Sequence, residues 1–204
     1  MPDDDVLGLR ERKKLDTRMA LSDAALELAF ERGLENVTRE EIAARAGVSV
    51  RTFNNYFTGK NDAIVYRQSV RIRRSLAILR DRPAAEPLWT ALTAALLEPF
   101  EADGAQFNLP NPAQLAEIRK LFSLAELRFA VAKEVSADWL EVIAERTGTD
   151  ALRDLYPRLV TGMIGAVIEA VMVAYTHADP PIHITLLLRR ALAEVAAGLP
   201  EPPR

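Results

Sequence analysis

The chain has 204 residues, of which 49% are hydrophobic and 27% charged, a balance typical of a globular protein with one or two compact units. The lack of cysteine excludes disulfide bonds, thiolate metal sites and a cysteine nucleophile. The net charge of −3 hides a change of sign, because residues 1–80 carry 15 Lys and Arg against 12 Asp and Glu, whereas residues 81–204 carry 11 against 17. Only the first part therefore suits a polyanionic partner.

The sequence begins M-P-D-D-D, without the basic and then apolar segments of a secretory signal. No apolar run reaches the roughly 20 residues that a membrane-spanning helix needs. We therefore expect a cytoplasmic protein without membrane contact. The sequence has no phosphate-binding glycine loop and no metalloprotease motif, so we expect no enzyme activity and no cofactor.

Two histidines, His177 and His183, flank an Asp-Pro-Pro turn and are candidate metal ligands. Asp179 is the only carboxylate near them, and no other ligand clusters there. The pattern therefore favours surface or interface positions for both histidines and predicts no metal site.

Residues 1–9, which include Pro2, three aspartates and Gly8, are expected to be disordered. A first helix is predicted over about 10–32, with its end at Gly33. Its inward apolar stripe consists of Leu21, Ala24, Ala25 and Leu28. The basic residues at its start fit either a nucleic-acid backbone contact or a solvated helix end, and they are Arg10, Arg12, Lys13, Lys14 and Arg18.

The next segment carries the signals of a short helix and a sharp turn. Thr38 and Glu41 have the spacing of a capping box, in which each side chain satisfies the other residue's backbone N–H. This predicts a helix over about 39–46. Gly47 follows where a left-handed residue is needed to end a helix.

Ser49 is a good N-cap for a second short helix over about 50–56. Phe53 and Phe57 lie four residues apart and should face the core. Two short helices joined by such a turn form a helix-turn-helix, whose second helix can enter the DNA major groove. An ordinary helical hairpin with a solvated polar face would show the same local pattern.

The outward face of the second helix has the chemistry that reads base edges. Its residues are Val50, Arg51, Asn54 and Asn55. An arginine such as Arg51 can bond guanine O6 and N7 together, and an asparagine can do the same to adenine N6 and N7. The residues at the margins suit phosphate oxygens, and these are Ser49, Thr52, Tyr56 and Lys60.

The string T-x-x-x-I-A-x-x-A-G-V-S-x-x-T-F-x-x-Y-F-x-x-K, over residues 38–60, resembles the N-terminal domain of the TetR family of bacterial repressors. The resemblance covers about residues 15–66 and implies a DNA-binding domain at 10–60 that binds an operator. The DNA-binding residues are then predicted to be Thr38, Arg39, Ser49, Val50, Arg51, Thr52, Asn54, Asn55, Tyr56 and Lys60. The family often has tyrosine where this chain has Asn54, so Asn54 is a candidate for reading a base instead of contacting the backbone.

A helix over about 60–79 should link this domain to a second one at 80–200. Its arginines are interpreted as a mostly solvated face, with ion pairs to the acidic second half as the alternative, and they are Arg67, Arg71, Arg73 and Arg74. Pro83 and Pro87 break the chain before a helix over about 88–102. Asn111 and Pro112 predict the start of the next helix, and Ser123 with Glu126 predicts a capping box that opens another, to about Arg146.

The last two predicted helices, over about 157–175 and 184–197, are apolar nearly all round. Such helices must be buried on more than one side, which a single domain of this size would struggle to achieve. A four-helix bundle shared by two subunits satisfies this requirement, and the family resemblance implies the same homodimer; a monomer core is the alternative. The predicted interface residues are Gly162, Gly165, Val173, Leu187, Leu188, Ala191 and Val195.

The resemblance also implies an effector pocket among the C-terminal helices. Its predicted lining is Trp89, Leu92, Leu96, Phe100, Phe122, Phe129, Trp139, Met163, Val167 and Glu169. Glu169, a lone carboxylate on an apolar helix, could meet either a ligand or the dimer partner. The apolar lining favours a small hydrophobic effector, and a looser likeness to actinobacterial members suggests a fatty-acyl compound.

Together these observations predict an all-α protein of about nine helices, with a three-helix helix-turn-helix domain and a helical ligand-binding and dimerisation domain. The function they favour is a repressor that binds a near-palindromic operator as a homodimer and is released by a small molecule. The alternative is a helical small-molecule-binding protein that keeps the fold without binding an operator.

Overall fold

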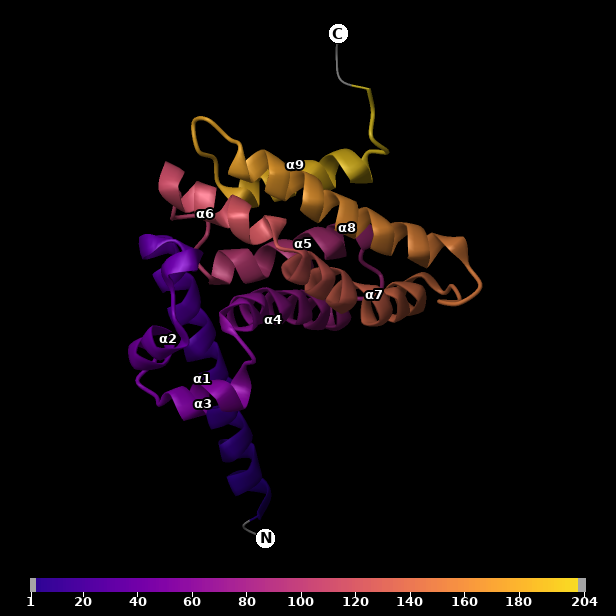
Figure 1. Cartoon of the computed structure of the whole chain (residues 1–204). Coiled ribbons are helices and arrows are strands. Elements are labelled where there is room, and N and C mark those ends of the chain that lie inside the picture. The colour runs from indigo at the N-terminus through magenta and orange to yellow at the C-terminus, as the bar shows by residue number, and fades with distance from the viewer. Residues whose placement is uncertain (1–2, 202–204) are drawn as a thin grey trace. The chain divides into compact units, whose positions relative to one another are not determined.

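The computed structural model describes the backbone of residues 3–201, and the side chains of that range except 3–7, 125–128 and 130–136. This part of the chain contains nine α-helices, one 3-10 turn and no strand, so the predicted all-α fold is confirmed (Figure 1). The elements are α1 (Asp3–Arg32), η1 (Leu34–Asn36), α2 (Arg39–Arg45), α3 (Val50–Tyr56), α4 (Lys60–Asp81), α5 (Leu88–Ala102), α6 (Pro112–Ser123), α7 (Ala125–Thr147), α8 (Leu155–Thr176) and α9 (Ile184–Ala196).

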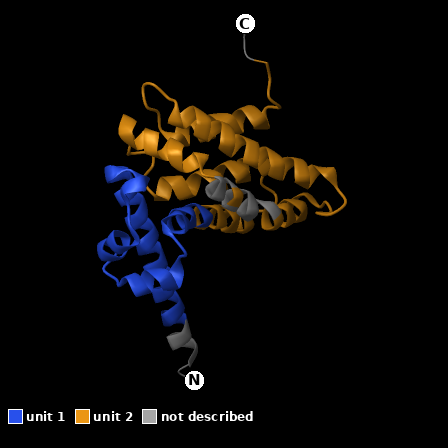
Figure 2. Ribbon diagram, in the orientation of Figure 1, with its two compact units in different colours: residues 1–69 blue, residues 70–204 orange. Residues whose placement is uncertain are grey.

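The helices form two compact units, residues 1–69 and 70–204 (Figure 2). Helix α4 is continuous through the boundary, so its first half belongs to unit 1 and its second half to unit 2.

Unit 1 packs around α1, and it begins earlier than expected. The helix starts at Asp3, so the prediction of disorder up to residue 9 is wrong for residues 3–9. The predicted apolar stripe of α1 is buried, and Ser22 beside it donates to the Ala63 carbonyl of α4 at 2.5 Å.

The local signals around α2 and α3 act as predicted. Thr38 accepts from the backbone N–H of Glu41 at 3.3 Å, and the Glu41 carboxylate accepts from the N–H of Thr38 at 2.9 Å. Gly47 has φ +68°, the left-handed conformation that ends α2. Ser49 accepts from the N–H of Thr52 at 3.1 Å and so caps α3. The rings of the two buried phenylalanines of this segment, Phe53 and Phe57, are in contact in a tilted arrangement, with centroids 5.8 Å apart and an interplanar angle of 49°.

Unit 2 is built around a single apolar core. Leu92 of α5, Trp139 of α7, Ile164 of α8 and Leu192 of α9 are all almost completely buried in it. The predicted start of α6 is confirmed, because Asn111 and Gln114 form a reciprocal capping box and Pro112 takes the first helical position.

The predicted capping box at Ser123 is wrong. Helix α7 begins at Ala125 with Leu124 at its N-cap, and the Ser123 hydroxyl instead donates back to the Lys120 carbonyl at 2.7 Å. The serine thus satisfies a carbonyl at the end of α6, the alternative that Ser and Thr side chains always have in the last turn of a helix.

The C-terminal end of α4 is held by a cation from α7. The Arg146 guanidinium donates to the carbonyls of Arg82 and Pro83, each at 2.9 Å. Helix C-terminal carbonyls lack intrahelical partners and attract positive charge. Hydrogen bonds from Arg82, helped by the charge of Arg146, hold the pKa of Glu86 below its usual value, which keeps a carboxylate beside both guanidinium groups.

Helix α8 buries one side and exposes the other. Val160, Ile164 and Val167 lie in the core, whereas Leu159 and Val173 are 58% and 57% exposed. By length and composition alone, α8 meets the criteria for a membrane-spanning helix, contrary to the expectation that no run would. A core helix of a globular unit meets the same criteria, and the buried side of α8 packs against α6, α7 and α9.

Candidate nucleic-acid interface

Helix α3 presents its polar residues to solvent. Arg51, Asn54 and Asn55 are exposed, whereas Phe53 and Phe57 are buried. The two phenylalanines fix the rotation of α3 about its axis, because only this rotation buries both rings. The amphipathic pattern of seven residues therefore decides which groups can reach a base edge.

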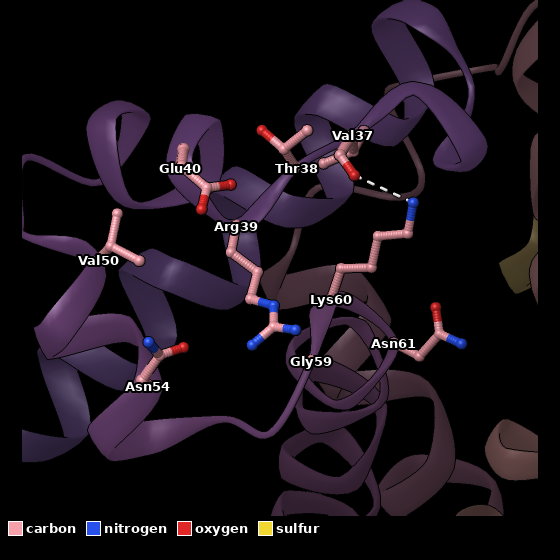
Figure 3. Close-up of a pocket in the computed structure, with 9 residues that line it drawn as sticks. All are labelled: Val37, Thr38, Arg39, Glu40, Val50, Asn54, Gly59, Lys60 and Asn61. Carbon is pink, nitrogen blue, oxygen red and sulfur yellow. Dashed lines mark hydrogen bonds between the residues drawn. The ribbon is translucent and has the colours of Figure 1, made fainter.

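A hollow of about 570 Å³ lies beside α3 (Figure 3). It brings together the starts of α2 and α4 and one side of α3. Its lining contains five of the predicted DNA-binding residues, and the full lining is Val37, Thr38, Arg39, Glu40, Val50, Asn54, Gly59, Lys60 and Asn61.

Arg39 and Lys60 point in different directions within this hollow. The Arg39 guanidinium extends across it between Asn54 and Gly59 (Figure 3). The Lys60 ammonium instead donates to three backbone carbonyls, those of Leu34 at 2.7 Å, Glu35 at 3.2 Å and Val37 at 3.0 Å. This placement differs from the predicted phosphate contact at Lys60.

Three of the other predicted DNA-binding residues, Thr38, Ser49 and Thr52, take part in capping α2 and α3. The Thr38 hydroxyl is engaged with the Glu41 carboxylate at 2.8 Å. The hydroxyls of Ser49 and Thr52 are 2.9 Å apart, so the cap of α3 uses both. Val50 and Tyr56 are half-buried at the edge of the exposed face.

Ion pairs on α1 set the charge around α2. Arg45 forms a two-pronged pair with Glu31 at 2.8 Å for both bonds, and it also meets Glu27 at 3.4 Å. Hydrogen bonds from Arg45 lower the pKa of Glu31, and those from Thr38 lower the pKa of Glu41. Arg45 is thus neutralised by its neighbours on α1, whereas Arg39 and Arg51 are exposed and form no ion pair with the described residues.

The sequence did not reveal several residues that shape this unit. The Arg18 guanidinium stacks on the Tyr66 ring at 4.2 Å and lies 5.3 Å from the Phe57 ring, so it is part of the packing and not a solvated helix end. Arg67 pairs with Asp23 of α1 instead of facing solvent. These partners are about 45 residues apart, a separation over which helical periodicity carries no signal.

The residues predicted to line an effector pocket fall into three groups. Four lie in the core, namely Leu92, Leu96, Trp139 and Val167. Four are half-buried against it, namely Trp89, Phe100, Phe122 and Met163. Two are exposed on the surface of the protomer, Phe129 and Glu169, so neither lines an internal space in this protomer.

The half-buried group has a cation beside it. Arg71 of α4 stacks on the Phe100 ring at 4.4 Å and pairs with Asp103 at 2.7 Å. This is the ion pair to the acidic half that the sequence left as an alternative. The pKa of Tyr175 lies above its ordinary value, because burial of the phenol outweighs the opposing effect of the charge of Arg71.

The predicted dimer residues are mostly accessible. Gly162, Gly165 and Val173 are exposed along one side of α8, and on α9 Leu187, Ala191 and Val195 are half-buried. Leu188 is the exception, because it is only 3% exposed and packs inside its own protomer. A one-residue step along a helix turns a side chain by about 100°, so Leu188 faces the core of unit 2 while Leu187 lies at the edge of that core.

Each of the two histidines has one ring nitrogen beside a backbone carbonyl. His177 Nδ1 lies 2.9 Å from the carbonyl of Val173, and His183 Nδ1 lies 3.3 Å from the carbonyl of Ala105. Among the described residues no group of three or more metal-ligating side chains gathers at one point.

A capped helix-turn-helix with an exposed polar recognition helix, followed by an all-helical second unit, defines the class of helix-turn-helix transcriptional regulators. The family model for bacterial regulatory proteins of the tetR family matches residues 21–63, and the model of the MftR C-terminal domain matches residues 86–200. The chain belongs to the TetR family of transcriptional regulators.

Named relatives agree with this assignment. The chain is 30% identical to the transcriptional regulator TcmR of Streptomyces glaucescens over 166 residues, which cover 78% of this chain and 73% of TcmR. It is 29% identical to MftR of Mycobacterium tuberculosis, whose name links it to mycofactocin biosynthesis, over 98% of both chains. Among solved structures, FadR of Bacillus subtilis in complex with stearoyl-CoA has a similar fold, with a TM-score of 0.57, 19% identity and coverage of 88% of this chain and 98% of FadR.

Proposed function

We propose that this protein is a repressor that binds a near-palindromic operator as a homodimer in the cytoplasm, and that a small hydrophobic effector releases it. The observation that carries the proposal is the exposed face of α3, where Arg51, Asn54 and Asn55 stand together on a helix fixed by two buried rings. In helix-turn-helix dimers two such helices enter successive major grooves about 34 Å apart, and the operator repeats the symmetry of the protein.

The homodimer is supported by the surface of α8. Glycine in the interior of a helix is destabilising by about 0.5–1 kcal/mol relative to alanine, so its presence needs a reason. A Cβ added at Gly162 or Gly165 would meet no atom within 4 Å in the described part of the protomer. The space is therefore not needed by the protomer's own packing, and a second helix approaching closely along this face would use it. Exposed Leu159 and Val173 on the same helix supply apolar area for that contact.

The operator-binding part of the proposal is tested by selecting bound duplexes from a random-sequence DNA pool with the purified protein at a stated salt concentration. We expect an inverted repeat with half-sites about one helical turn apart. Arg51→Ala should lose the preference at one base position of each half-site, roughly 10- to 100-fold in affinity ratio, because a bidentate base contact is worth about 1–3 kcal/mol.

The matched control is Arg74→Ala, which removes an exposed arginine of α4 that lies outside the hollow beside α3. It should leave the selected sequence unchanged. An Arg51→Ala protein that keeps full operator selectivity would remove Arg51 from the reading surface. If the unmodified protein selects no sequence and shows only salt-weakened binding, the alternative of a helical small-molecule-binding protein takes the place of the repressor.

The effector is proposed to be a fatty acyl thioester of coenzyme A. The support is the half-buried apolar group around Phe100 with Arg71 beside it, which pairs an apolar surface with a cation, together with the bound stearoyl-CoA in the FadR structure of similar fold. A ligand releases the operator only if it prefers the DNA-incompetent arrangement of the dimer. Arg71 lies on α4, the helix that belongs to both units, so a ligand that engages it acts directly on that helix.

Titrating stearoyl-CoA into the protein–operator complex should release the DNA, measured as a fall in fluorescence anisotropy of labelled operator. Free coenzyme A should have no effect, because it lacks the apolar chain that occupies the core-facing surface. Arg71→Gln should weaken the response to stearoyl-CoA while leaving operator affinity without ligand within a few-fold. Release by free coenzyme A, or none by stearoyl-CoA up to its solubility limit, would rule this effector class out.

A further inference from the structure

Lys60, the first residue of α4, directs its ammonium group at backbone carbonyls of the protein itself. Its ammonium has three N–H donors, and it lies within hydrogen-bond distance of three carbonyls, those of Leu34, Glu35 and Val37. Figure 3 shows the Lys60 side chain extended toward the Val37 carbonyl, whereas the Arg39 side chain extends toward Gly59 and Asn54. The donors of Lys60 are therefore occupied before any DNA arrives.

The three acceptors converge because of a local turn. Gly33 has φ +86°, which turns the chain sharply after α1 and lets the short 3-10 turn η1 follow at once. Backbone carbonyls have two lone pairs and carry partial negative charge, so each can accept a further hydrogen bond from a cation. Lys60 thus acts as a cap for η1 supplied by a helix 23 to 26 residues further along the chain.

We propose that Lys60 is a positioning residue for DNA recognition and not a phosphate ligand. Its hydrogen bond to the Val37 carbonyl ties the start of α4 to the residue that precedes the N-cap of α2. The next two residues, Thr38 and Arg39, line the hollow together with Asn54 of α3. The bond therefore fixes the separation between the start of α2 and the start of α4, on which the direction of Arg39 depends. The DNA-binding consequence rests on the proposed function, whereas the tie itself does not.

Arg39 differs from Lys60 in that its cationic group remains available to a phosphate. It is exposed, and within the described part of the chain its guanidinium makes no hydrogen bond or ion pair. A basic side chain that neutralises one phosphate contributes about 0.9 to the slope of log affinity against log salt concentration. Arg39 should make that contribution and Lys60 should not, which separates the two roles in one type of measurement.

The experiment compares Lys60→Met, Lys60→Arg and Arg39→Gln in the full chain. Methionine keeps the length of the aliphatic stem and removes all three donors, and arginine restores a cation with several N–H groups. Hydrogen exchange of the peptide covering residues 33–38 reports on the tie without DNA. Affinity for the selected operator is measured between 50 and 200 mM salt, a range over which about one lost phosphate contact is readily resolved.

For Lys60→Met we expect a folded protein with faster exchange at residues 33–38, an operator affinity that falls about tenfold, as for loss of a hydrogen bond to a charged group, and an unchanged salt slope. Lys60→Arg should recover most of the affinity and the protection. Arg39→Gln should lower the slope by about 0.9 and leave exchange unchanged. If Lys60→Met does not fold, Lys60→Gln, whose amide keeps two donors, takes its place.

A slope lowered by about 0.9 in Lys60→Met, with unchanged exchange at residues 33–38, would overturn the proposal and make Lys60 a phosphate ligand. Faster exchange with full operator affinity would also overturn it, because Lys60 would then stabilise the turn without positioning the DNA-binding residues. Failure of the proposed function is distinguishable from both, since a protein that selects no operator still reports the tie through hydrogen exchange.

Discussion

Replacing Gly165 with leucine should leave the protomer folded and separate the dimer. The substitution adds a side chain where the described part of the protomer leaves open space, and it replaces the poorest helix former but proline with one of the best. The protomer should therefore gain up to about 1 kcal/mol in stability. The partner helix that we propose to lie against this position would be pushed away by the added volume, because a glycine contact requires close approach of two backbones.

The consequence for DNA binding should be large. Two linked half-site contacts exceed one by a factor of about 100 or more, so operator affinity should fall by at least that factor when the dimer separates. Sedimentation equilibrium gives the mass, circular dichroism the helix content and anisotropy the operator affinity. Ala77→Leu, at an exposed position on α4, is the matched control and should remain dimeric. A Gly165→Leu protein that stays dimeric with unchanged affinity would place the interface elsewhere.

Replacing Trp139 with alanine should cost about 3–5 kcal/mol in free energy of unfolding, the usual loss when a large aromatic side chain is removed from a core. Trp139 is 1% exposed and belongs to the hydrophobic core of unit 2. The change leaves a cavity that the surrounding helices cannot fill. Urea unfolding followed at 222 nm, at one fixed protein concentration, measures the loss.

Trp139→Phe separates the volume from the polar group. The indole N–H is buried without a hydrogen-bond partner among the described residues, and an unpaired buried donor costs about 1–3 kcal/mol. Phenylalanine fills most of the space and removes that donor, so its net loss should be less than half that of alanine. An alanine protein as stable as the unmodified one would contradict the place of Trp139 in the core. A phenylalanine protein as unstable as the alanine one would show that the donor is satisfied in solution.

The elements that could be predicted closely are those with signals at both ends. Helix α5 runs from Leu88 to Ala102 as expected, because Pro87 precedes it and Asp103 with Gly104 follows it. The start of α6 was equally clear from Asn111 and Pro112. At Ser123 the same kind of reasoning failed, since a serine near a helix end can satisfy either the helix that ends or the helix that begins, and spacing does not tell which.

In the candidate site, too, some features could be predicted from the local sequence and others could not. Which residues of α3 face outward followed from Phe53 and Phe57 alone, because four-residue spacing fixes one face of a helix. The role of Lys60 did not follow, since its partners Leu34, Glu35 and Val37 are brought to it only by the turn at Gly33 and the packing of α4 on α1. A basic residue at a helix start looks the same in sequence whether it faces a phosphate or a carbonyl.

The sequence by itself determined the all-α class, the helix-turn-helix with its capped ends, and the apolar character of α8 and α9, because capping, glycine turns and helical periodicity act within a few residues. The tertiary structure alone decided which charged groups are occupied. In the folded protein Arg18 packs on the rings of Tyr66 and Phe57, and Lys60 donates to the backbone carbonyls that precede α2. These contacts join residues that are far apart in the sequence. They form only after burial of the apolar core has brought the helices together.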